Sequence, residues 1–496
     1  MQIPAVPSEP IPTAIALAIV GVLLVVSVLS SRATERLGVP VLLVFLAIGM
    51  AVGSEGLGLL PFEDYQLAYR LGTVALVFIL FDGGFNTSMA VIRRVAAPAA
   101  VLASLGVVGT AAVLAGGAYL IGLSAPEALL VSAVVSSTDA AAVFAVLRGS
   151  GVHLQRRVGA TLEVESGAND PMAVILTMAI TQSLIENASG LSWRILPMIV
   201  IQIVVGGLLG IAIGHAGRFL LSRVRVAAAG LLAVQLVGVA CLAFALPTLM
   251  YGSGFLGVYI AGVVLGNGHL PYKAGLQRVH DGLAWLSQVT MFIVLGLLVF
   301  PSRLLEIAPI GLLVALFLTF IARPVVVWLC LLPFKYPRRE VAYIAWVGLR
   351  GAVPIVLATF PVLAGARGGE RIFDLVFFIV VLSALIPGAT VSWLAKRLKL
   401  EAAEPPAPPA VLQFESVQPL NGDLLSFYVD EALPVAGVRL ADIPLPEGAS
   451  VALIVRGREL VPPRAYTVLE VGDHVYVFTR HEDRALIQLM FGRPEE

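Results

Sequence analysis

Two acidic residues stand inside apolar stretches that are long enough to cross a bilayer. Asp139 ends the run Ser136-Ser-Thr-Asp139, and Asp170 ends the run Glu165-Ser-Gly-Ala-Asn-Asp170. A charged carboxylate is costly in hydrocarbon, so such residues face the protein interior and mark ion or proton pathways. Carboxylate, hydroxyl and carbonyl oxygens are also the ligands that a hard monovalent cation prefers. We therefore interpret the two runs as parts of one cation or proton site.

The spacing within the second run separates its side chains onto two helix faces. Ser166 and Asp170 are four residues apart and share a face, with Asn169 beside them. Glu165 lies about 140° round the helix from Asp170, so it must find its partner elsewhere. Pro171 directly follows the acid and lacks an N–H, so we expect it to disturb the helix at this point. A carboxylate that holds either a proton or a cation, but not both, can exchange the two ions.

Arg350 is the clear basic residue deep in the second half of the apolar region, within Gly-Leu-Arg350-Gly-Ala-Val-Pro-Ile355. Gly351 and Pro354 predict an interrupted helix here. Corresponding interrupted segments in two halves of a chain are typical of inverted-repeat transporters with a site at the membrane midplane.

The buried arginine needs a carboxylate partner. Glu165 is our first choice for Arg350, and Glu163 is our second. Arg323 precedes Pro324 and is expected to lie nearer the end of its segment, from which it can snorkel to the interface.

Composition places these residues in a polytopic membrane protein. Hydrophobic residues make up 58% of the 496 residues and charged residues only 13%, whereas soluble domains carry roughly a quarter charged residues. Mean hydropathy is +0.94. The formal net charge of zero argues against a nucleic-acid partner. Two cysteines in apolar runs support neither a disulfide framework nor a metal cluster.

The chain predicts an all-α membrane domain over residues 1–400. It contains about thirteen apolar segments of bilayer length, near residues 12–31, 39–55, 70–86, 95–122, 126–147, 156–183, 194–220, 227–249, 251–267, 280–299, 306–332, 340–362 and 372–395. One set of alternate loops carries about eighteen Lys and Arg and the other about five, so the richer set is cytoplasmic. The N-terminus is then outside and the C-terminus inside.

A small α+β domain is predicted after the membrane region. Residues 401–410 form a Pro-rich spacer, and residues 411–496 read as a cytoplasmic domain. The runs Val451–Val455 and His474–Phe478 are predicted strands, and Asp483–Met490 a short helix. A tethered cytoplasmic domain of this size favours a regulatory or dimerisation role.

Taken together, the motifs resemble those of a known transporter family. Ser-Ser-Thr138-Asp139, Glu165-Ser-x-x-Asn-Asp170 and Gly-x-Arg350-Gly resemble the signature set of NhaP-type antiporters, in the monovalent cation/proton antiporter-1 family. With the tail Leu445-Pro-x-Gly448, Pro462 and Gly472-Asp473, the chain most resembles the bacterial potassium/proton antiporters that carry a TrkA C-terminal (RCK C-terminal) domain. This resemblance implies a thirteen-helix homodimer in the inner membrane. It also implies exchange of a cation for a proton by an elevator-like motion of a core bundle, in support of pH and cation homeostasis.

The resemblance also implies roles for single residues. It makes Asp170 and Asp139 the cation and proton carboxylates, Thr138 and Ser166 oxygen ligands, Asn169 the amide of the Asn-Asp pair, and Arg350 with Glu165 a structural ion pair. Asn in place of a second Asp before Asp170 resembles the electroneutral branch of the family. Asp82 stands where relatives have Glu, and it either joins the site or lines an entrance. Val164 stands where the family often has Gly.

Several alternatives remain open at this level. Ser166 and Thr138 can instead bond the helix backbone, and Asn169 can orient helices rather than bind an ion. His215, His269 and His280 can sense pH or be solvated loop residues. Na⁺ or Li⁺ exchange uses the same ligand types as K⁺ exchange, and the preference for K⁺ rests on the resemblance alone.

Other classes of protein explain less of the chain. A cation channel needs a continuous polar pore, and a membrane-anchored sensor leaves the two acids without a role. The sequence shows no H-E-x-x-H or comparable constellation, so an enzyme is not expected. No cofactor beyond the transported ions is expected either. Residues 411–496 can bind a nucleotide-type regulatory ligand or simply hold two protomers together.

Overall fold

The computed structural model describes residues 11–37, 40–60, 62–186, 193, 195–223, 229–268, 270–402, 422–457, 459–492 and 494. The chain divides into a large helical unit, residues 1–268 with 277–402, and a small unit, residues 269–276 with 403–496. Most of the predicted Pro-rich spacer at 401–410, the start of the predicted domain at 411–496, and His269 lie outside the described residues. The predicted domain boundaries therefore stay predictions.

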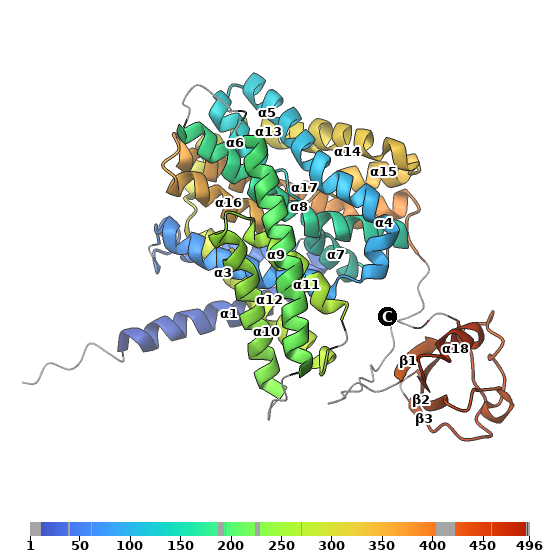
Figure 1. Cartoon of the computed structure of the whole chain (residues 1–496). Coiled ribbons are helices and arrows are strands. Elements are labelled where there is room, and N and C mark those ends of the chain that lie inside the picture. Colours follow the sequence, from blue (N-terminus) through green and yellow to red (C-terminus); the bar gives the residue numbers. More distant parts are fainter. Residues whose placement is uncertain are drawn as a thin grey trace, which may run out of the picture. The chain divides into compact units, whose positions relative to one another are not determined.

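The large unit is entirely helical in its described part, apart from short connections (Figure 1). Its first helices are α1 (Ile11–Leu37), α2 (Val41–Val52), α3 (Tyr65–Asn86), α4 (Met89–Val101), α5 (Val107–Ile121), α6 (Ala125–Val134), α7 (Ala140–Gly149) and α8 (Arg156–Glu186). The others are α9 (Ile195–Arg223), α10 (Ala229–Leu249), α11 (Gly254–Gly266), α12 (Lys273–Leu297), α13 (Pro301–Phe317), α14 (Arg323–Leu331), α15 (Arg338–Trp346), α16 (Ala352–Leu363) and α17 (Gly369–Arg397).

Seven of the described helices are long and apolar enough to cross a membrane by length and composition. Six further apolar helices are shorter, and three of these, α6, α7 and α16, belong to the interrupted segments α6–α7 and α15–α16. A fully apolar helix of about 20 residues is needed to span the hydrocarbon core, so shorter pieces span only in pairs or when buried in protein. The number of crossings, predicted as thirteen, stays a prediction.

The same order of elements occurs twice along the chain. In the first half, α4 and α5 are joined by a π-helical turn at Leu102–Gly106, and then come the interrupted pair α6–α7 and the long helix α8. In the second half, α13 and α14 are joined by a π-helical turn at Leu318–Ala322, followed by the pair α15–α16 and the long helix α17. Repeated elements with one interrupted helix each are the organisation expected of an inverted-repeat transporter.

The ten helices of these two repeats pack on one another, and we call them the core bundle: α4–α8 and α13–α17. Within it, α4 and α6 pack against α8, α13 packs against α5 and α17, and α16 packs against α17. The remaining helices, α1–α3 and α9–α12, form what we call the flanking bundle. The core and flanking bundles meet mainly where α3 packs on α16 and where α9 and α11 pack on α8.

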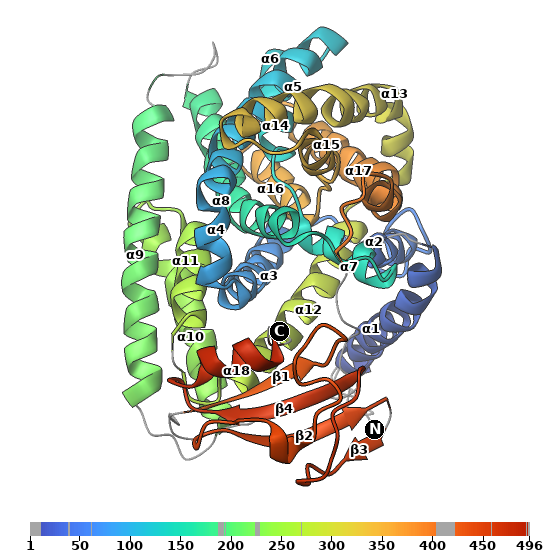
Figure 2. The ribbon, with the colours of Figure 1, turned by 90° about the vertical axis from the view of Figure 1, so that its right-hand side faces the viewer.

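The flanking bundle is held by close contacts between helix backbones. Its helices α9, α10 and α11 run side by side in both views (Figures 1 and 2). On the other side of α11, a Cβ added to Gly84 of α3 would overlap the carbonyl oxygen of Tyr259, and one added to Gly262 would lie 2.6 Å from the carbonyl oxygen of Phe81. Small residues let membrane helices approach in this way, which favours a rigid pairing of α3 with α11.

The small unit holds an antiparallel sheet in the order β1-β4-β2-β3 and one helix. Its elements are β1 (Asp423–Tyr428), β2 (Ser450–Arg456), β3 (Glu459–Val461), β4 (Asp473–Thr479) and α18 (Arg484–Phe491). Figure 2 shows α18 beside the sheet, and its residues Ile487 and Phe491 join the core formed by Phe427, Ile454 and Val475. The two predicted strands and the predicted short helix are confirmed.

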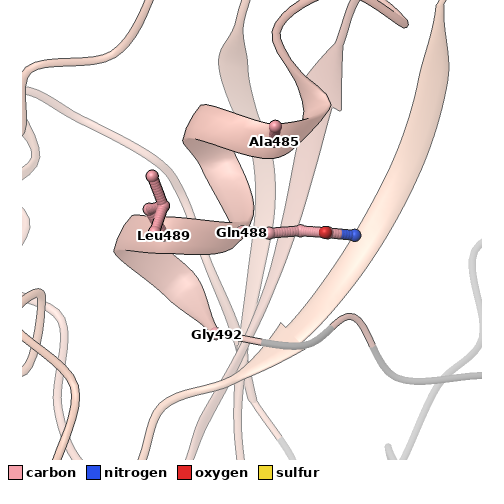
Figure 3. A pocket seen from close by; sticks show the side chains of 4 residues that line it. All are labelled: Ala485, Gln488, Leu489 and Gly492. Carbon is pink, nitrogen blue, oxygen red and sulfur yellow. The ribbon is translucent and has the colours of Figure 1, made fainter.

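One ion pair between a partly exposed arginine and a buried carboxylate joins the central strands of this sheet. Arg456 of β2 donates from Nε and Nη2 to the two carboxylate oxygens of Asp473 at 2.8 and 2.9 Å. Hydrogen bonding to this carboxylate raises the pKa of Arg456 above its ordinary value. On the outer side of α18, Leu489 is exposed and lines a shallow pocket with Ala485, Gln488 and Gly492 (Figure 3).

Candidate ion-binding site where two interrupted helices meet

The two interrupted helices of the core bundle meet at their non-helical segments. The first segment, residues 135–139, separates α6 from α7, and the second, residues 347–351, separates α15 from α16. The backbone N–H of Asp139 donates to the carbonyl oxygen of Leu349 at 2.8 Å. A Cβ on Gly351 would overlap Oδ2 of Asp139. Gly351 therefore allows the Asp139 carboxylate to lie directly against the start of α16.

Two side chains of α8 hold the first segment open. The hydroxyl of Ser166 donates to the carbonyl oxygen of Thr138 at 3.0 Å and accepts from the N–H of Ala140 at 3.0 Å. Nδ2 of Asn169 donates to Oγ1 of Thr138 at 2.6 Å. Oδ1 of Asn169 accepts from the backbone N–H of Thr138 at 3.4 Å. These bonds satisfy backbone groups that a continuous helix would have paired internally.

We call the place where the two interrupted helices meet the crossing. The cationic side chain there, Arg350, lies at helix C-termini. Nε of Arg350 donates to the carbonyl oxygen of Val135 at 2.7 Å, just past the end of α6, and Nη1 donates to the carbonyl oxygen of Gly348. The N–H of Arg350 donates to Oγ of Ser383 on α17 at 3.0 Å. Because the C-terminal ends of helices carry partial negative charge, a guanidinium is stabilised at this position.

One of the two acidic side chains lies at the opposite kind of helix end. Asp139 is the N-cap of α7, and its Oδ1 accepts from the N–H of Ala142 at 3.0 Å. Asp139 lies close enough to Asp170 of α8 for the two carboxylates to interact electrostatically. Helix N-termini favour negative charge. The crossing thus gathers the Asp139 carboxylate at the N-terminus of α7, the Asp170 carboxylate within α8, and one guanidinium at helix C-termini.

The burial pattern of α8 follows the predicted faces. Ser166 and Asp170 are half-buried, whereas Glu165 and Asn169 are fully buried. Asp139 is also half-buried. Both acids therefore keep some accessible surface, whereas Glu165 and Asn169 keep almost none.

The predicted ion pair between Arg350 and Glu165 is wrong. Glu165 pairs instead with Arg323, the first residue of α14, at 2.7 Å between Oε1 and Nη2. Arg323 is 3% exposed and Glu165 is 1% exposed, so Arg323 does not lie at a segment end and does not snorkel. The guanidinium of Arg350 is used by the carbonyls of the two interruptions. A side chain on Gly348 would touch both arginines, which shows how close the two lie.

Other sequence expectations have mixed outcomes. Pro171 does not interrupt its helix, because α8 is continuous from Arg156 to Glu186. Asp82 is half-buried on α3, and its Oδ1 accepts from Asn86 at 3.0 Å; its membership of the ion site stays a prediction. His280 is not a solvated loop residue, since it is 2% exposed and stands edge-on to Phe81. His215 is exposed on α9.

Sequence reasoning missed three contributors to the crossing, and it also missed the buried ion pair of Arg323. The carbonyls of Val135 and Leu349 carry no signal in the sequence, and Ser383 is one of many hydroxyls in apolar helices. Arg323 did carry a signal, because an arginine within the apolar segment 306–332 needs a buried partner as much as Arg350 does.

Comparison with known proteins agrees with this geometry. The family profile described as sodium/hydrogen exchanger, transmembrane, matches residues 15–397, and the TrkA-C domain profile matches residues 424–492. The chain is 40% identical over 469 residues to the K(+)/H(+) antiporter NhaP of Alkalimonas amylolytica, covering 94% of this chain and 81% of that protein. It is 39% identical over 484 residues to the K(+)/H(+) antiporter NhaP2 of Shewanella oneidensis, covering 96% and 83%.

A solved structure has the same fold. The sodium proton antiporter MjNhaP1 from Methanocaldococcus jannaschii superposes with a TM-score of 0.68 at 25% identity, covering 78% of this chain and 99% of that one. Fold, interrupted helices and sequence similarity over nearly the whole chain agree. The chain belongs to the sodium/hydrogen exchanger family of membrane transporters, and it is a transporter rather than an enzyme.

Proposed function

We propose that this chain exchanges K⁺ for H⁺ across the inner (plasma) membrane, with one site serving both ions in turn. The names of its relatives, both K(+)/H(+) antiporters, support the choice of K⁺. The observation that carries the proposal is the placement of Asp139 and Asp170 at the meeting point of two interrupted helices. Na⁺ is the second candidate, because MjNhaP1 is named a sodium proton antiporter and both ions take oxygen ligands.

The site residues divide into carriers and supports. Asp170 and Asp139 are the carriers, since a carboxylate can hold a proton or a cation. Ser166, Asn169 and Thr138 are bonded to one another or to the backbone, which supports a role in shaping the site. Oxygens of Thr138 and Ser166 can add ligands to an ion that lies between the acids. Asp82, from the flanking bundle, either joins them or lines the entrance.

The amide at position 169 bears on the stoichiometry. Asn169 cannot carry a proton, and both of its polar atoms face Thr138. An acid at this position would add a third titrating group. We therefore propose one cation per proton, an electroneutral exchange, with pH and cation homeostasis as its role. No cofactor is needed beyond the transported ions.

The direct test is proton movement in proteoliposomes that contain a pH-sensitive dye. Pulses of K⁺, Na⁺ and Li⁺ applied separately should move protons, with K⁺ most effective, and Asp170→Asn should abolish the signal. Asp374→Asn is a matched control, because Asp374 of α17 is 3% exposed in the same bundle and lies by Arg303 rather than at the crossing. Full exchange by Asp170→Asn would contradict the proposal.

The remaining expectations concern placement and regulation. We propose that the N-terminus is outside and the C-terminus in the cytoplasm, from the loop charges, and that two copies form a homodimer. We also propose that the TrkA-C region takes a nucleotide-type ligand that regulates exchange. Exchange with and without residues 411–496, and crosslinking in native membranes, test these points.

A further inference from the structure

Transport by one site that serves both sides of the membrane requires motion between the core and flanking bundles. The chain passes between the two bundles at three places: residues 87–88, 187–194 and 298–300. The middle connection lies largely outside the described residues. The other two are two and three residues long, and each residue spans at most about 3.6 Å. Helix ends joined by such short connections cannot slide far apart, so they must act as pivots.

At the first connection, a side chain of the flanking bundle binds the backbone at both ends of this connection. Asn267, the C-cap of α11, accepts from the N–H of Met89 at 2.6 Å through Oδ1. Its Nδ2 donates to the carbonyl oxygen of Thr87 at 2.9 Å and to that of Val263 in its own helix at 2.8 Å. Asn267 thus fixes the first residue of α4 and the residue after α3 to the end of α11.

At the second connection, Glu55 does the same for α13. Its Oε2 accepts from the N–H of Ser302 at 2.9 Å, and its Oε1 accepts from the Ser302 hydroxyl at 2.5 Å. The N-cap position of α13 is Phe300, which offers no side-chain acceptor. The free N–H groups of the first turn therefore find their acceptor in the loop between α2 and α3.

The two contacts occupy equivalent places in the two repeats. Helices α4 and α13 are the first helices of their repeats, and each is bound at its N-terminal end by an oxygen of the flanking bundle. Met89 lies near Arg93 and Arg94, which belong to the arginine-rich set of loops, whereas Ser302 adjoins Arg303, which belongs to the other set. We propose that Asn267 and Glu55 are hinge clamps, the positioning residues that hold the two pivots about which the core bundle carries the Asp139–Asp170 site. This inference rests on the proposed function.

The charge of Glu55 shows when its clamp is formed. The Ser302 side chain and then the Ser302 backbone N–H bind the carboxylate, and they lower the pKa of Glu55 below its ordinary value of 4.5. Because the pKa of Glu55 is lower in the folded protein, its contribution to stability is complete above the ordinary pKa. This contribution is lost only as the pH falls through the lowered pKa. The clamp is therefore fully formed at neutral and alkaline pH, and its removal should slow exchange by the same factor throughout that range.

The test compares clamp variants with matched controls in proteoliposomes. We expect Asn267→Ala and Glu55→Ala to lower K⁺/H⁺ turnover about tenfold, as for the loss of one or two hydrogen bonds to a positioned group, with an unchanged KM for K⁺. Asn267→Asp keeps the acceptor for Met89 and should recover part of the rate. Gln182→Ala removes the hydrogen bond from the Gln182 side-chain amide to Glu186 within α8. Glu370→Gln removes an ion pair with Arg303 within the core bundle. Both controls should keep normal turnover.

A second measurement separates a hinge from a simple helix cap. Spin labels at Cys241 of the flanking bundle and at Leu105→Cys of the core bundle, with Cys330→Ser, report the distance between bundles. Clamp variants should broaden this distance distribution, and the controls should not. Normal turnover in both alanine variants, an unchanged distribution, or equal losses in the controls would overturn the inference. If Asp170→Asn still abolishes exchange in that case, the proposed function stands and only the hinge fails.

Discussion

The interruptions between α6 and α7 and between α15 and α16 are equally long, five residues each, but their chemistry is opposite. The first contains three hydroxyl residues and Asp139, with no glycine, and it is held open by side chains of α8. The second contains two glycines around Arg350, and its arginine reaches across to the carbonyl of Val135. The first supplies a negative charge at the N-terminus of α7, and the second supplies a positive charge at helix C-termini.

The difference shows that an interrupted helix can be encoded locally or by its surroundings. Glycines open the second interruption from within, because Gly348 leaves room for the side chains of Arg323 and Arg350, and Gly351 leaves room for the Asp139 carboxylate. The first interruption depends on partners 26 to 31 residues away in sequence, Ser166 and Asn169. Changes inside the second segment should therefore act by steric clash, and changes around the first by loss of hydrogen bonds.

The largest effect is expected from Gly351→Ala. Its new Cβ would overlap Oδ2 of Asp139 and approach Cγ of that residue to 2.8 Å, so the carboxylate must leave its place against α16. Displacing a carrier by about an ångström can cost on the order of a hundredfold in rate, and we expect dye-detected K⁺/H⁺ exchange to fall by that much. Gly149→Ala in α7 is the control, because a Cβ there meets nothing within 4 Å. Equal exchange in both variants would contradict the steric account.

An intermediate effect is expected at the buried pair Glu165–Arg323. Removing one partner leaves an uncompensated charge in the core bundle, so Arg323→Met should destabilise the protein by about 3 to 5 kcal/mol. Adding Glu165→Leu removes both charges and should restore much of the thermal stability measured in detergent. The same Glu165→Leu change should give no such rescue to Arg350→Met, because Arg350 binds carbonyls of the interruptions. If Glu165→Leu instead restored the thermal stability of Arg350→Met, the predicted ion pair between Arg350 and Glu165 would be supported.

The two interruptions and the residues around them also show what could be predicted from the sequence. Gly351 and Pro354 predicted the second interruption, and four-residue spacing predicted that Ser166 and Asp170 share a face while Glu165 points away. The apolar segments and the motifs predicted the transporter fold. Each of these properties is local, since it depends on residues within one or two helical turns.

The features that failed are all set by tertiary contacts. The choice of Arg323 over Arg350 depends on the tertiary arrangement that brings Arg323 of α14 to Glu165 of α8, which helix periodicity does not contain. Pro171 leaves α8 continuous because helices in a membrane bundle can satisfy the freed backbone group through neighbours. The first interruption could not be foreseen from breaker residues, because its cause lies in the amide of Asn169 and the hydroxyl of Ser166.

The smallest effect is expected at the hydroxyl of Thr138, and it decides between a support and a ligand. Thr138→Val removes the 2.6 Å bond from Asn169 while nearly keeping the shape. Side-chain hydrogen bonds within membrane bundles contribute about 0.6 kcal/mol on average, so a support role predicts a rise in KM for K⁺ of about threefold. A direct ligand role predicts a much larger rise, because the ion would lose an oxygen with no replacement. Thr161→Val in α8 is the matched control, since its hydroxyl meets Tyr336 at 2.8 Å, away from the crossing. An unchanged KM in Thr138→Val would remove the Thr138 hydroxyl from both roles, and the first interruption would then depend on Ser166 and on the backbone contact of residue 138 with Asn169.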